Sequence, residues 1–310
     1  MLVKREAEIG DKGKKPEDRS VNELLDYGIV VIDKPKGPTT HQVADYVKKI
    51  LNIKKCGHSG SLDPGVTGVV VIGLGRSTKV VHNLLRAGKE YVCIMHIHKP
   101  LAEDEIRKAI NSFRGEIRQL PPVKSSVKRQ ERTRKIYYID ILELDGQDVF
   151  FKVGCEAGTY IRKLCHDIGK KLRVGAHMAE LRRTKVGNLD ESLAATLQDL
   201  SDAHAFYAEG DEKELKKILL PMEKAVGHLP KIDVTDTTVD SLCHGATLNV
   251  PGISKLDDEI LKGDQVAVMT LKGELIMTGI AQMTSGQIMK EQKGIAVKPE
   301  RVFMEPGVYS

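Results

Sequence analysis

The twelve residues from Gly57 to Gly68 constrain the fold more than any other part of the chain. This segment reads GHSGSLDPGVTG, and with four glycines and one proline it can form neither a helix nor a central strand. Its one carboxylate, Asp63, is soon followed by the apolar run 69–74, which has the composition of a buried strand. The pattern indicates a tight loop that leads into a sheet and fixes one acidic side chain. Asp63 is then either a catalytic group or a turn residue that bonds to nearby backbone N–H groups.

The loop resembles the catalytic motif of the TruB-type pseudouridine synthases, and most closely that of their archaeal and eukaryotic guide-RNA-dependent branch, the dyskerin type. The resemblance implies that Asp63 is the essential catalytic residue, and it places His58 among the substrate-binding residues. Ser61 and Gly65 depart from the family pattern, in which threonine and lysine are expected. Neither departure touches the carboxylate, but Gly65 removes one possible phosphate contact.

The segment before this loop predicts a buried strand over 27–35, a rigid turn, and a helix with apolar residues at helical spacing over 43–51. Thr40 could cap this helix. The segment resembles the opening motif of the same family, which implies that Lys34 and Pro35 support the active-site loop. A plain strand-to-helix connection would account for each of these residues equally well.

Tyr91 lies at the start of a strand predicted over 88–98. In the family a tyrosine at the matching position packs on the target base and takes part in proton transfer, so the resemblance gives Tyr91 that role. Without the resemblance, a tyrosine in a strand would more often be a core residue.

Arg162 follows the pair Gly158–Thr159, which is typical of a helix start, and falls in the first turn of the helix. The run 158–162 resembles the family's Gly-Thr-Tyr-Ile-Arg motif, which implies that Arg162 pairs with Asp63. A guanidinium can hold a carboxylate through two hydrogen bonds and keep it ionised in a closed site. The alternative is an exposed helix arginine.

Residues 174–187 resemble a fourth family motif. The resemblance implies that Leu181 contacts a flipped base, and that Arg182 and Arg183 point toward the backbone or toward acidic residues, with Arg182 counted among the substrate-binding residues. Lys185 replaces an expected arginine, which keeps the charge and loses the bidentate geometry.

The basic segment 120–135 lies between predicted strands and resembles the mobile thumb loop of the family. Lys128, Arg129 and Arg132 would neutralise phosphates there. Glu131 stands where an apolar residue is expected.

Residues 114–135 carry eight Lys/Arg against two Asp/Glu, and 160–187 carry the same excess, whereas 232–310 carry seven against eleven. This distribution favours a polyanion partner for the first two-thirds of the chain.

The predicted organisation is an extended or partly disordered arm over 1–22, a catalytic domain over 23–229 and a second domain over 230–310. The fold class is α+β: a mixed or antiparallel sheet with flanking helices, followed by a small β-barrel. Short strands at 265–271 and 274–281, joined at Lys272–Gly273, indicate the barrel, and the pattern resembles a PUA RNA-binding domain.

The composition excludes several classes of protein. No apolar run approaches the roughly 20 residues that span a bilayer, and the charged N-terminus lacks a signal core, so we expect no membrane contact. Five scattered cysteines without Cys-x-x-Cys spacing favour a reducing compartment and argue against zinc. Cys155, Cys165 and His166 are more readily explained as structural residues than as ligands. No phosphate-loop or dinucleotide motif occurs, and we expect neither a metal nor a cofactor.

The resemblance covers about residues 24–306 and implies an RNA uridine-to-pseudouridine isomerase acting on rRNA or tRNA, with a box H/ACA guide RNA, a substrate RNA and small accessory proteins as partners. Two alternatives are a stand-alone enzyme for the tRNA T-arm and a non-catalytic RNA-binding scaffold. Because no lysine-rich tail follows Ser310, we expect a cytoplasmic protein of archaeal type.

Overall fold

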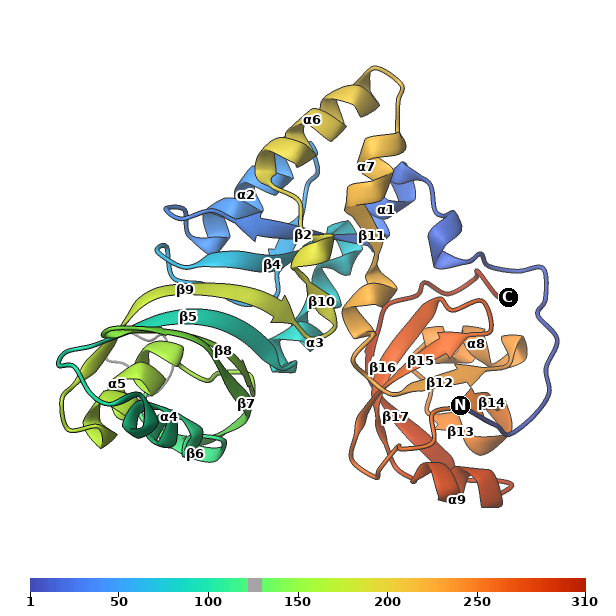
Figure 1. Ribbon diagram of the computed structural model, residues 1–310. Helices are drawn as coiled ribbons and strands as arrows, with labels where there is room; N and C mark the ends of the chain where they lie inside the picture. The colour runs from blue at the N-terminus through green and yellow to red at the C-terminus, as the bar shows by residue number, and fades with distance from the viewer. Residues whose placement is uncertain (122–129) are drawn as a thin grey trace.

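A computed structural model describes residues 1–121 and 130–310, and it contains two sheets that lie side by side (Figure 1). The larger sheet belongs to the unit on the left of Figure 1 and the smaller one to the orange and red unit on the right. In the described residues the strands of the larger sheet run in the order β11 (Leu219–Pro221), β2 (Gly28–Lys34), β4 (Thr67–Leu74), β9 (Ala176–Val186), β5 (Lys89–Ile97), β8 (Asp148–Cys155), β7 (Arg132–Asp145) and β6 (Gly115–Gln119), with β3 (Cys56–His58) on β4 and β10 (Leu189–Asp190) on β9.

The sheet is mixed, because β4 and β9 are parallel whereas the other strand pairs in it are antiparallel. Burial along each strand follows from what covers its two faces. Strands β2 and β4 are buried almost throughout because both their faces are covered. Strand β5 alternates between buried and half-buried residues, because only one of its faces packs on the core. The run of apolar residues in β4 and the alternation in β5 therefore reflect different degrees of burial within one sheet.

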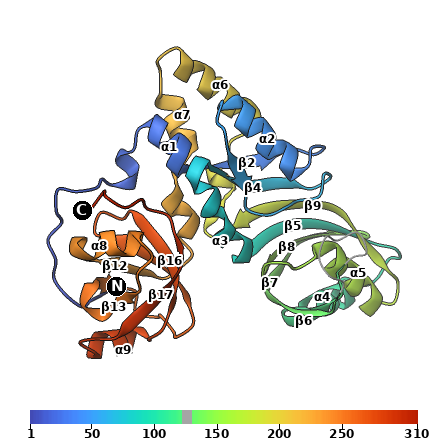
Figure 2. The same ribbon diagram turned by 180° about the vertical axis from the view of Figure 1, so that it is seen from behind.

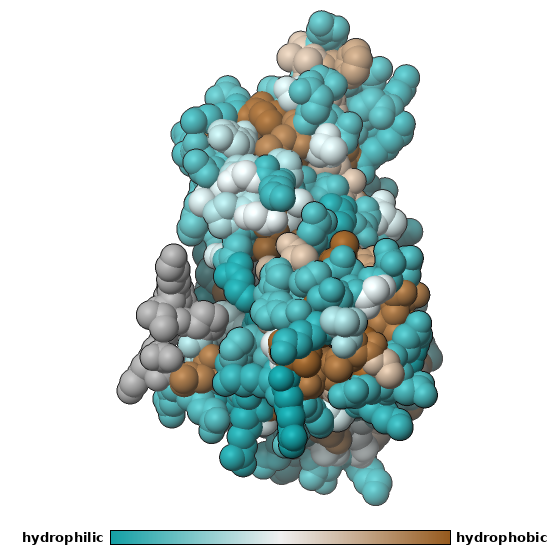
Figure 3. Space-filling view, turned by 60° about the vertical axis from the view of Figure 1, so that its left-hand side comes forward, coloured by the Kyte–Doolittle hydropathy of each residue, from teal (hydrophilic) through white to brown (hydrophobic). Residues whose placement is uncertain are grey.

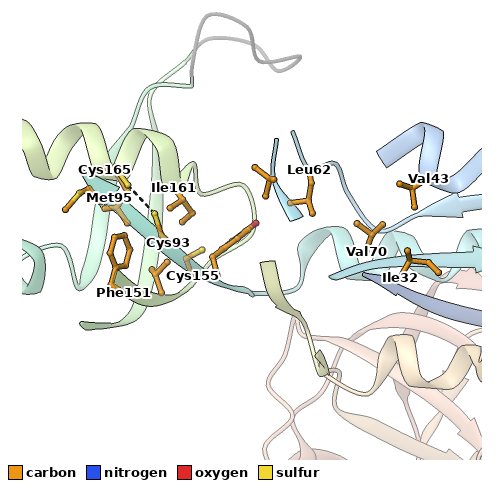
Figure 4. Packing of buried hydrophobic residues seen from close by; sticks show 14 of the residues in the cluster. Ile32, Val43, Leu62, Val70, Cys93, Met95, Phe151, Cys155, Ile161 and Cys165 are labelled. Carbon is orange, nitrogen blue, oxygen red and sulfur yellow. Dashed lines mark hydrogen bonds between the residues drawn. The ribbon is translucent and has the colours of Figure 1, made fainter. Parts of the chain in front are cut away.

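Helices cover the sheet on the side of its main core (Figures 1 and 2). The helices of this unit are α1 (Val21–Tyr27), α2 (Thr40–Ile50), α3 (Val81–Arg86), α4 (Glu103–Asn111), α5 (Ile161–Lys171), α6 (Leu197–Ala208) and α7 (Lys213–Ile218). The main core joins α2 and α6 over β2 and β4 with α4 and α5 over β5 and β8. Figure 4 shows this packing, with Val43 and Val70 in one group and Cys93, Phe151 and Cys165 in the other.

Capping explains where α2 begins. The hydroxyl of Thr39 accepts a hydrogen bond from the backbone N–H of Gln42, and the side-chain oxygen of Gln42 accepts one from the backbone N–H of Thr39. Thr39 is the N-cap, so the capping role predicted for Thr40 is wrong; Thr40 is the first helical residue. The helix start predicted at Gly158–Thr159 lies two residues early as well, since α5 begins at Ile161.

The second sheet also includes the start of the chain. Its strands in the described residues run in the order β1 (Leu2–Val3), β14 (Ile253–Leu256), β12 (Lys231–Val234), β15 (Gln265–Thr270), β16 (Leu275–Ala281), β17 (Ile295–Val302) and β13 (Leu248–Asn249), with α8 (Asp236–Cys243) and α9 (Ser285–Lys290) packed on them. The hairpin predicted at Lys272–Gly273 is confirmed, and Gly273 has a φ of 84°. The α+β class predicted from the sequence is therefore confirmed.

The N-terminal arm is extended, as expected, but it is held against the second sheet rather than free. Strand β1 pairs with β14, and Lys4 donates to the backbone carbonyl groups of Met289 and Glu291. Arg19 then forms a buried, bidentate ion pair with Glu223. The arm thus ties the first residues of the chain to both units.

A third core joins the two units. Ile29, Val31 and Val69 pack on the face of the larger sheet opposite the main core, together with Met269 and Phe303 of the second unit. A 3₁₀ turn, η4 (Met222–Val226), contributes to the same cluster. This interface is apolar and fully buried, so the two sheets form one continuous structure.

Figure 3 shows the side of the molecule on which the larger unit comes forward, where apolar surface is visible between hydrophilic side chains. Leu142 and Tyr137 of β7 are among the exposed large side chains of this unit. In the described parts of the chain, 1–121 and 130–310, no helix has the length and apolar character needed to cross a lipid bilayer.

Candidate active site

A cavity of about 470 Å³ opens where the glycine-rich loop, β5, β9 and the start of α5 meet. The loop contributes Asp63, α5 contributes Arg162, and the two sheet strands contribute Tyr91 and Leu181. Four segments that are far apart in the sequence therefore bring the predicted catalytic residues to one place. The cavity can hold a small ring system, and it is open to solvent.

Asp63 and Arg162 face each other across this cavity. Nη2 of Arg162 donates to Oδ2 of Asp63 over 2.7 Å. Each side chain is 59% exposed. The pairing predicted from the sequence is present, but it consists of one hydrogen bond rather than two, and the pair lies in an open site rather than a closed one. An ion pair this exposed contributes at most about 1 kcal/mol to stability, so its value to the protein is not structural.

Lys34 holds the loop that carries Asp63. Its side chain is fully buried, and Nζ donates to the backbone carbonyl groups of Pro35, Pro64 and Val66. Burial lowers the pKa of the Lys34 ammonium, and the positive charge of Arg183 lowers it further. Because a buried ammonium needs acceptors, the three carbonyl groups keep the loop folded around it. The support predicted for Lys34 is thus visible in its contacts.

Two further contacts fix the ends of the loop. Thr40 of α2 accepts a hydrogen bond from the backbone N–H of Leu62, next to Asp63, and donates to the Leu62 carbonyl. At the other end, Gly68 has a φ of 102°, and a Cβ atom there would lie 2.1 Å from the backbone oxygen of Arg183. Glycine is required at this position because β4 and β9 approach too closely for a side chain.

Tyr91 forms the floor of the cavity and is only 9% exposed. Burial raises the pKa of its phenol, an effect partly offset by the charge of Arg183. The hydroxyl therefore keeps its proton at neutral pH. Leu181 lies on β9 opposite Cys93 of β5 and also lines the cavity. Tyr91 and Leu181 thus both line the cavity, and their contact with a base stays a prediction.

Arg183 points toward the backbone, as the resemblance implied, and it also lines the cavity, which the sequence reasoning did not anticipate. It is 2% exposed, and its Nε donates to the carbonyl group of Val69. Burial lowers the pKa of its guanidinium. Alternate residues of a strand face the same side of a sheet, so Leu181 at the cavity implies that Arg183 faces it too and that Arg182 does not. The period of the strand was the signal that could have found it.

Lys89 was also missed. Its Nζ donates to the carbonyl groups of Leu84, Leu85 and Ala87, so it closes the end of α3, and its side chain lines the cavity. Burial, followed by the Arg183 charge, lowers its pKa to about 8. Lysine at the C-terminal end of a helix is favourable because the last carbonyl groups there lack partners.

Arg182 points away from the cavity. Its guanidinium forms two hydrogen bonds of 2.9 Å with Asp33 and a third with Glu191. The predicted direction toward acidic residues is therefore confirmed. Because two carboxylates already neutralise this side chain, its place among the substrate-binding residues gains no support from the geometry.

His58 lies behind the loop rather than in the cavity. Its ring contacts that of His41 edge-on, with centroids 4.5 Å apart, and its Nδ1 accepts a hydrogen bond from the backbone of Gly60. Burial, followed by the charge of His41, lowers its pKa. His58 therefore acts on the site by shaping the loop, and its direct contact with substrate stays a prediction.

Of the predicted thumb residues, Arg132 is the first residue of β7 and pairs with Gln119 of β6. Lys128 and Arg129 lie outside the described residues. The segment predicted to lie between strands, 120–135, overlaps β7, because β7 begins at Arg132. In the described ranges, no three His, Cys, Asp or Glu side chains are grouped in a way that could hold a metal ion.

The chain matches four family models along its length. Residues 48–161 match the N-terminal domain of the TruB family pseudouridylate synthases, and residues 162–227 match the C-terminal domain of tRNA pseudouridylate synthase B. Residues 230–303 match the PUA domain, and residues 1–44 match the DKCLD (NUC011) domain.

Similar proteins span nearly the same length. A probable tRNA pseudouridine synthase B of Pyrococcus horikoshii is 54% identical over 98% of this chain and 92% of its own. The crystal structure of a Cbf5–Nop10–Gar1 complex contains a chain that is 51% identical, with a TM-score of 0.96 over 99% of this chain and 95% of that one. An H/ACA RNP bound to a substrate RNA containing 2′-deoxyuridine contains a chain that is 49% identical, with a TM-score of 0.93 over 100% of this chain and 96% of that one.

Proposed function

The chain belongs to the TruB family of pseudouridylate synthases, and from this membership we propose that it converts uridines of rRNA or tRNA to pseudouridine as the catalytic subunit of a box H/ACA particle. The observation that carries this proposal is the Asp63–Arg162 contact of 2.7 Å in the 470 Å³ cavity. An RNA-binding scaffold would have no need of an exposed carboxylate held by an exposed guanidinium above a buried tyrosine.

The target uridine has to leave its stack before it can enter the cavity, at a cost of a few kcal/mol. Tyr91 and Leu181 then hold the uracil between them. Asp63 acts as the nucleophile, on the ribose or on the base, and the bond from the ribose to the ring nitrogen breaks. The uracil turns and rejoins the ribose through carbon 5 as the bond to Asp63 breaks. Carbon 5 then loses its proton and the freed ring nitrogen gains one, so the product is an isomer of the substrate. Tyr91 keeps its phenol proton, so its hydroxyl can accept the proton from carbon 5 only while it passes the phenol proton to another group.

Arg162 keeps the Asp63 carboxylate aimed at the substrate, while Lys34 and Thr40 keep the loop in place. Arg183 places a positive charge beside Tyr91 at the floor of the cavity. Lys128, Arg129 and Arg132 bind RNA phosphates in this proposal, and Arg182 and His58 stabilise the walls of the site. No step uses a metal or a nucleotide cofactor.

The guide-dependent assignment is supported by the similar structures, which are a Cbf5–Nop10–Gar1 complex and an H/ACA RNP bound to a substrate RNA. We propose that this chain takes an H/ACA guide RNA, a substrate RNA and small accessory proteins of the same kinds. A second candidate is a stand-alone enzyme, favoured by the name tRNA pseudouridine synthase B that the sequence relatives carry. Cytoplasmic location stays a prediction, which cell fractionation would check.

The purified full-length chain is incubated with tRNA alone and with a guide RNA paired to a substrate RNA, and pseudouridine is counted in each RNA. Product only with guide supports the proposal, and product on bare tRNA supports the stand-alone enzyme. No product with either RNA supports the scaffold. Asp63→Asn should abolish turnover and leave RNA affinity within about tenfold, or about 1.4 kcal/mol. Full activity of this variant would contradict the catalytic role of Asp63.

A further inference from the structure

A second cavity lies where the catalytic unit meets the second sheet. It has a volume of about 240 Å³, roughly half that of the first cavity. His82, Asn83 and Arg86 of α3 line one side, and Thr278, Glu300 and Arg301 of β16 and β17 line the other. None of these residues belongs to the site described above.

Two buried polar atoms in this cavity have no partner in the described structure. Nδ2 of Asn83 lacks an acceptor although its side chain is 93% buried, and the hydroxyl of Thr278 is unpaired although that residue is fully buried. Buried polar groups are nearly always hydrogen-bonded, so two orphans in one cavity indicate a guest that supplies the missing partners. The amide of Asn83 needs an acceptor, and the hydroxyl of Thr278 can take either role.

The rim of this cavity carries both hydrogen-bond donors and hydrogen-bond acceptors. Arg86 and Arg301 are exposed donors, and their charges exceed the single negative charge of Glu300. The carboxylate of Glu300 adds acceptors. The amide nitrogen of Gln265 donates to Asn83 and to Glu300, and the amide oxygen of Gln265 is a further acceptor. A phosphate has acceptors alone, so it would offer no donor to Glu300 or to the Gln265 side chain. A nucleobase edge carries donors and acceptors together, and its faces can stack on the ring of His82 or on an arginine plane.

We propose that this second cavity binds one unstacked nucleobase of the RNA on which the enzyme acts, or of the RNA that guides it. The inference rests on the proposed function in that the chain has to bind RNA. Leu85 lines both cavities and is 42% exposed, so the second cavity lies next to the first along α3. A strand of RNA that places a uridine over Asp63 therefore has a neighbouring anchor point at the junction of the two units.

Thr278→Val tests the cavity with little risk to the fold. Valine has nearly the shape of threonine, and the hydroxyl that it removes has no partner in the free protein, so thermal stability should stay the same or rise. Binding is measured by fluorescence anisotropy with two probes: a mixed-sequence single-stranded RNA of about 20 nucleotides, and an abasic ribose-phosphate chain of the same length. We expect Thr278→Val to weaken binding of the RNA about three- to tenfold and to leave binding of the abasic chain unchanged.

Arg86→Gln provides a second measurement with a matched control. Arg86 and Arg107 each lie 3.4 Å from a glutamate oxygen on an exposed surface, but Arg107 is on α4, away from this cavity. Arg86→Gln should weaken RNA binding by more than Arg107→Gln does. Equal weakening of the RNA and of the abasic chain by the cavity variants would indicate a phosphate site and overturn the proposal, as would no effect on either.

Turnover of the same variants separates this proposal from the proposed function. If the wild-type chain binds the RNA through the cavity but forms no pseudouridine on any RNA, the nucleobase pocket stands and the catalytic proposal fails. If it forms pseudouridine while the cavity variants bind and react as the wild type does, the pocket is overturned and the catalytic proposal stands. A wild-type chain that binds neither probe would overturn the pocket as well.

Discussion

Replacing Arg162 with glutamine should separate the catalytic value of the Asp63–Arg162 pair from its structural value. The two side chains are each 59% exposed and share one contact of 2.7 Å. The free energy of unfolding should therefore fall by no more than about 1 kcal/mol. In the described part of the chain no other side chain bonds to the Asp63 carboxylate, so Arg162→Gln leaves it free to rotate.

Turnover should fall far more than stability does. A misplacement of about 1 Å at a reacting group can cost about 100-fold, which corresponds to about 2.7 kcal/mol of the barrier. We therefore expect kcat for pseudouridine formation to drop at least about 100-fold. Arg162→Lys should recover part of the loss, because a single hydrogen bond to Oδ2 does not need the guanidinium fork.

The assay is single-turnover formation of pseudouridine with enzyme in excess, alongside urea unfolding of each variant. Single-turnover conditions separate chemistry from product release. Arg107→Gln, an exposed arginine of α4, serves as the charge-matched control and should change neither quantity appreciably. A loss of less than about fivefold in Arg162→Gln, which is about 1 kcal/mol, would refute the positioning role.

Three further predictions concern the structure that supports the site. Lys34→Met should orphan three carbonyl groups around the loop and lower the free energy of unfolding by about 2 kcal/mol or more, measured by urea titration, with turnover falling as well. Arg19→Met should cost about 3–5 kcal/mol because it leaves Glu223 buried and unpaired, and adding Glu223→Leu should restore most of the loss in a double-mutant cycle. Burial lowers the pKa of His228 to about 4. Between pH 4 and 6.5 the folded state therefore binds fewer protons than the unfolded state, and the free energy of unfolding should rise with pH across that window. His228→Gln should flatten this rise in thermal melts, and an unchanged slope would contradict the argument.

The sequence predicted the catalytic loop and its neighbours because their chemistry is local. Glycine and proline spacing over 57–68 requires a tight loop wherever it occurs, and the period of apolar residues identified β2, α2 and β5 close to their observed bounds. The helix starts at α2 and α5 were off by one or two residues, because capping depends on which of several neighbouring hydroxyl groups reaches a free N–H.

The resemblance to the family also implied that Asp63 and Arg162 meet, although 99 residues separate them. It did not indicate that the pair is exposed and joined by one hydrogen bond, since exposure depends on what the rest of the fold leaves uncovered. The same holds for the N-terminal arm. Its charged, polar residues indicate little order by themselves, and it is ordered only because β14 offers a free edge and Glu223 a buried partner.

Local residue chemistry thus determined the elements and the glycine-rich loop that carries Asp63, whereas the grouping of Asp63, Tyr91 and Arg162 was implied by the resemblance to the family. Only the tertiary structure decided which charged groups face the cavity. It turned Arg183 and Lys89 inward and Arg182 outward, and it placed Asn83 beside Thr278 at the junction of the two units. The physical reason is that strand pairing and close packing set the direction of each side chain, and both depend on contacts between residues far apart in the sequence.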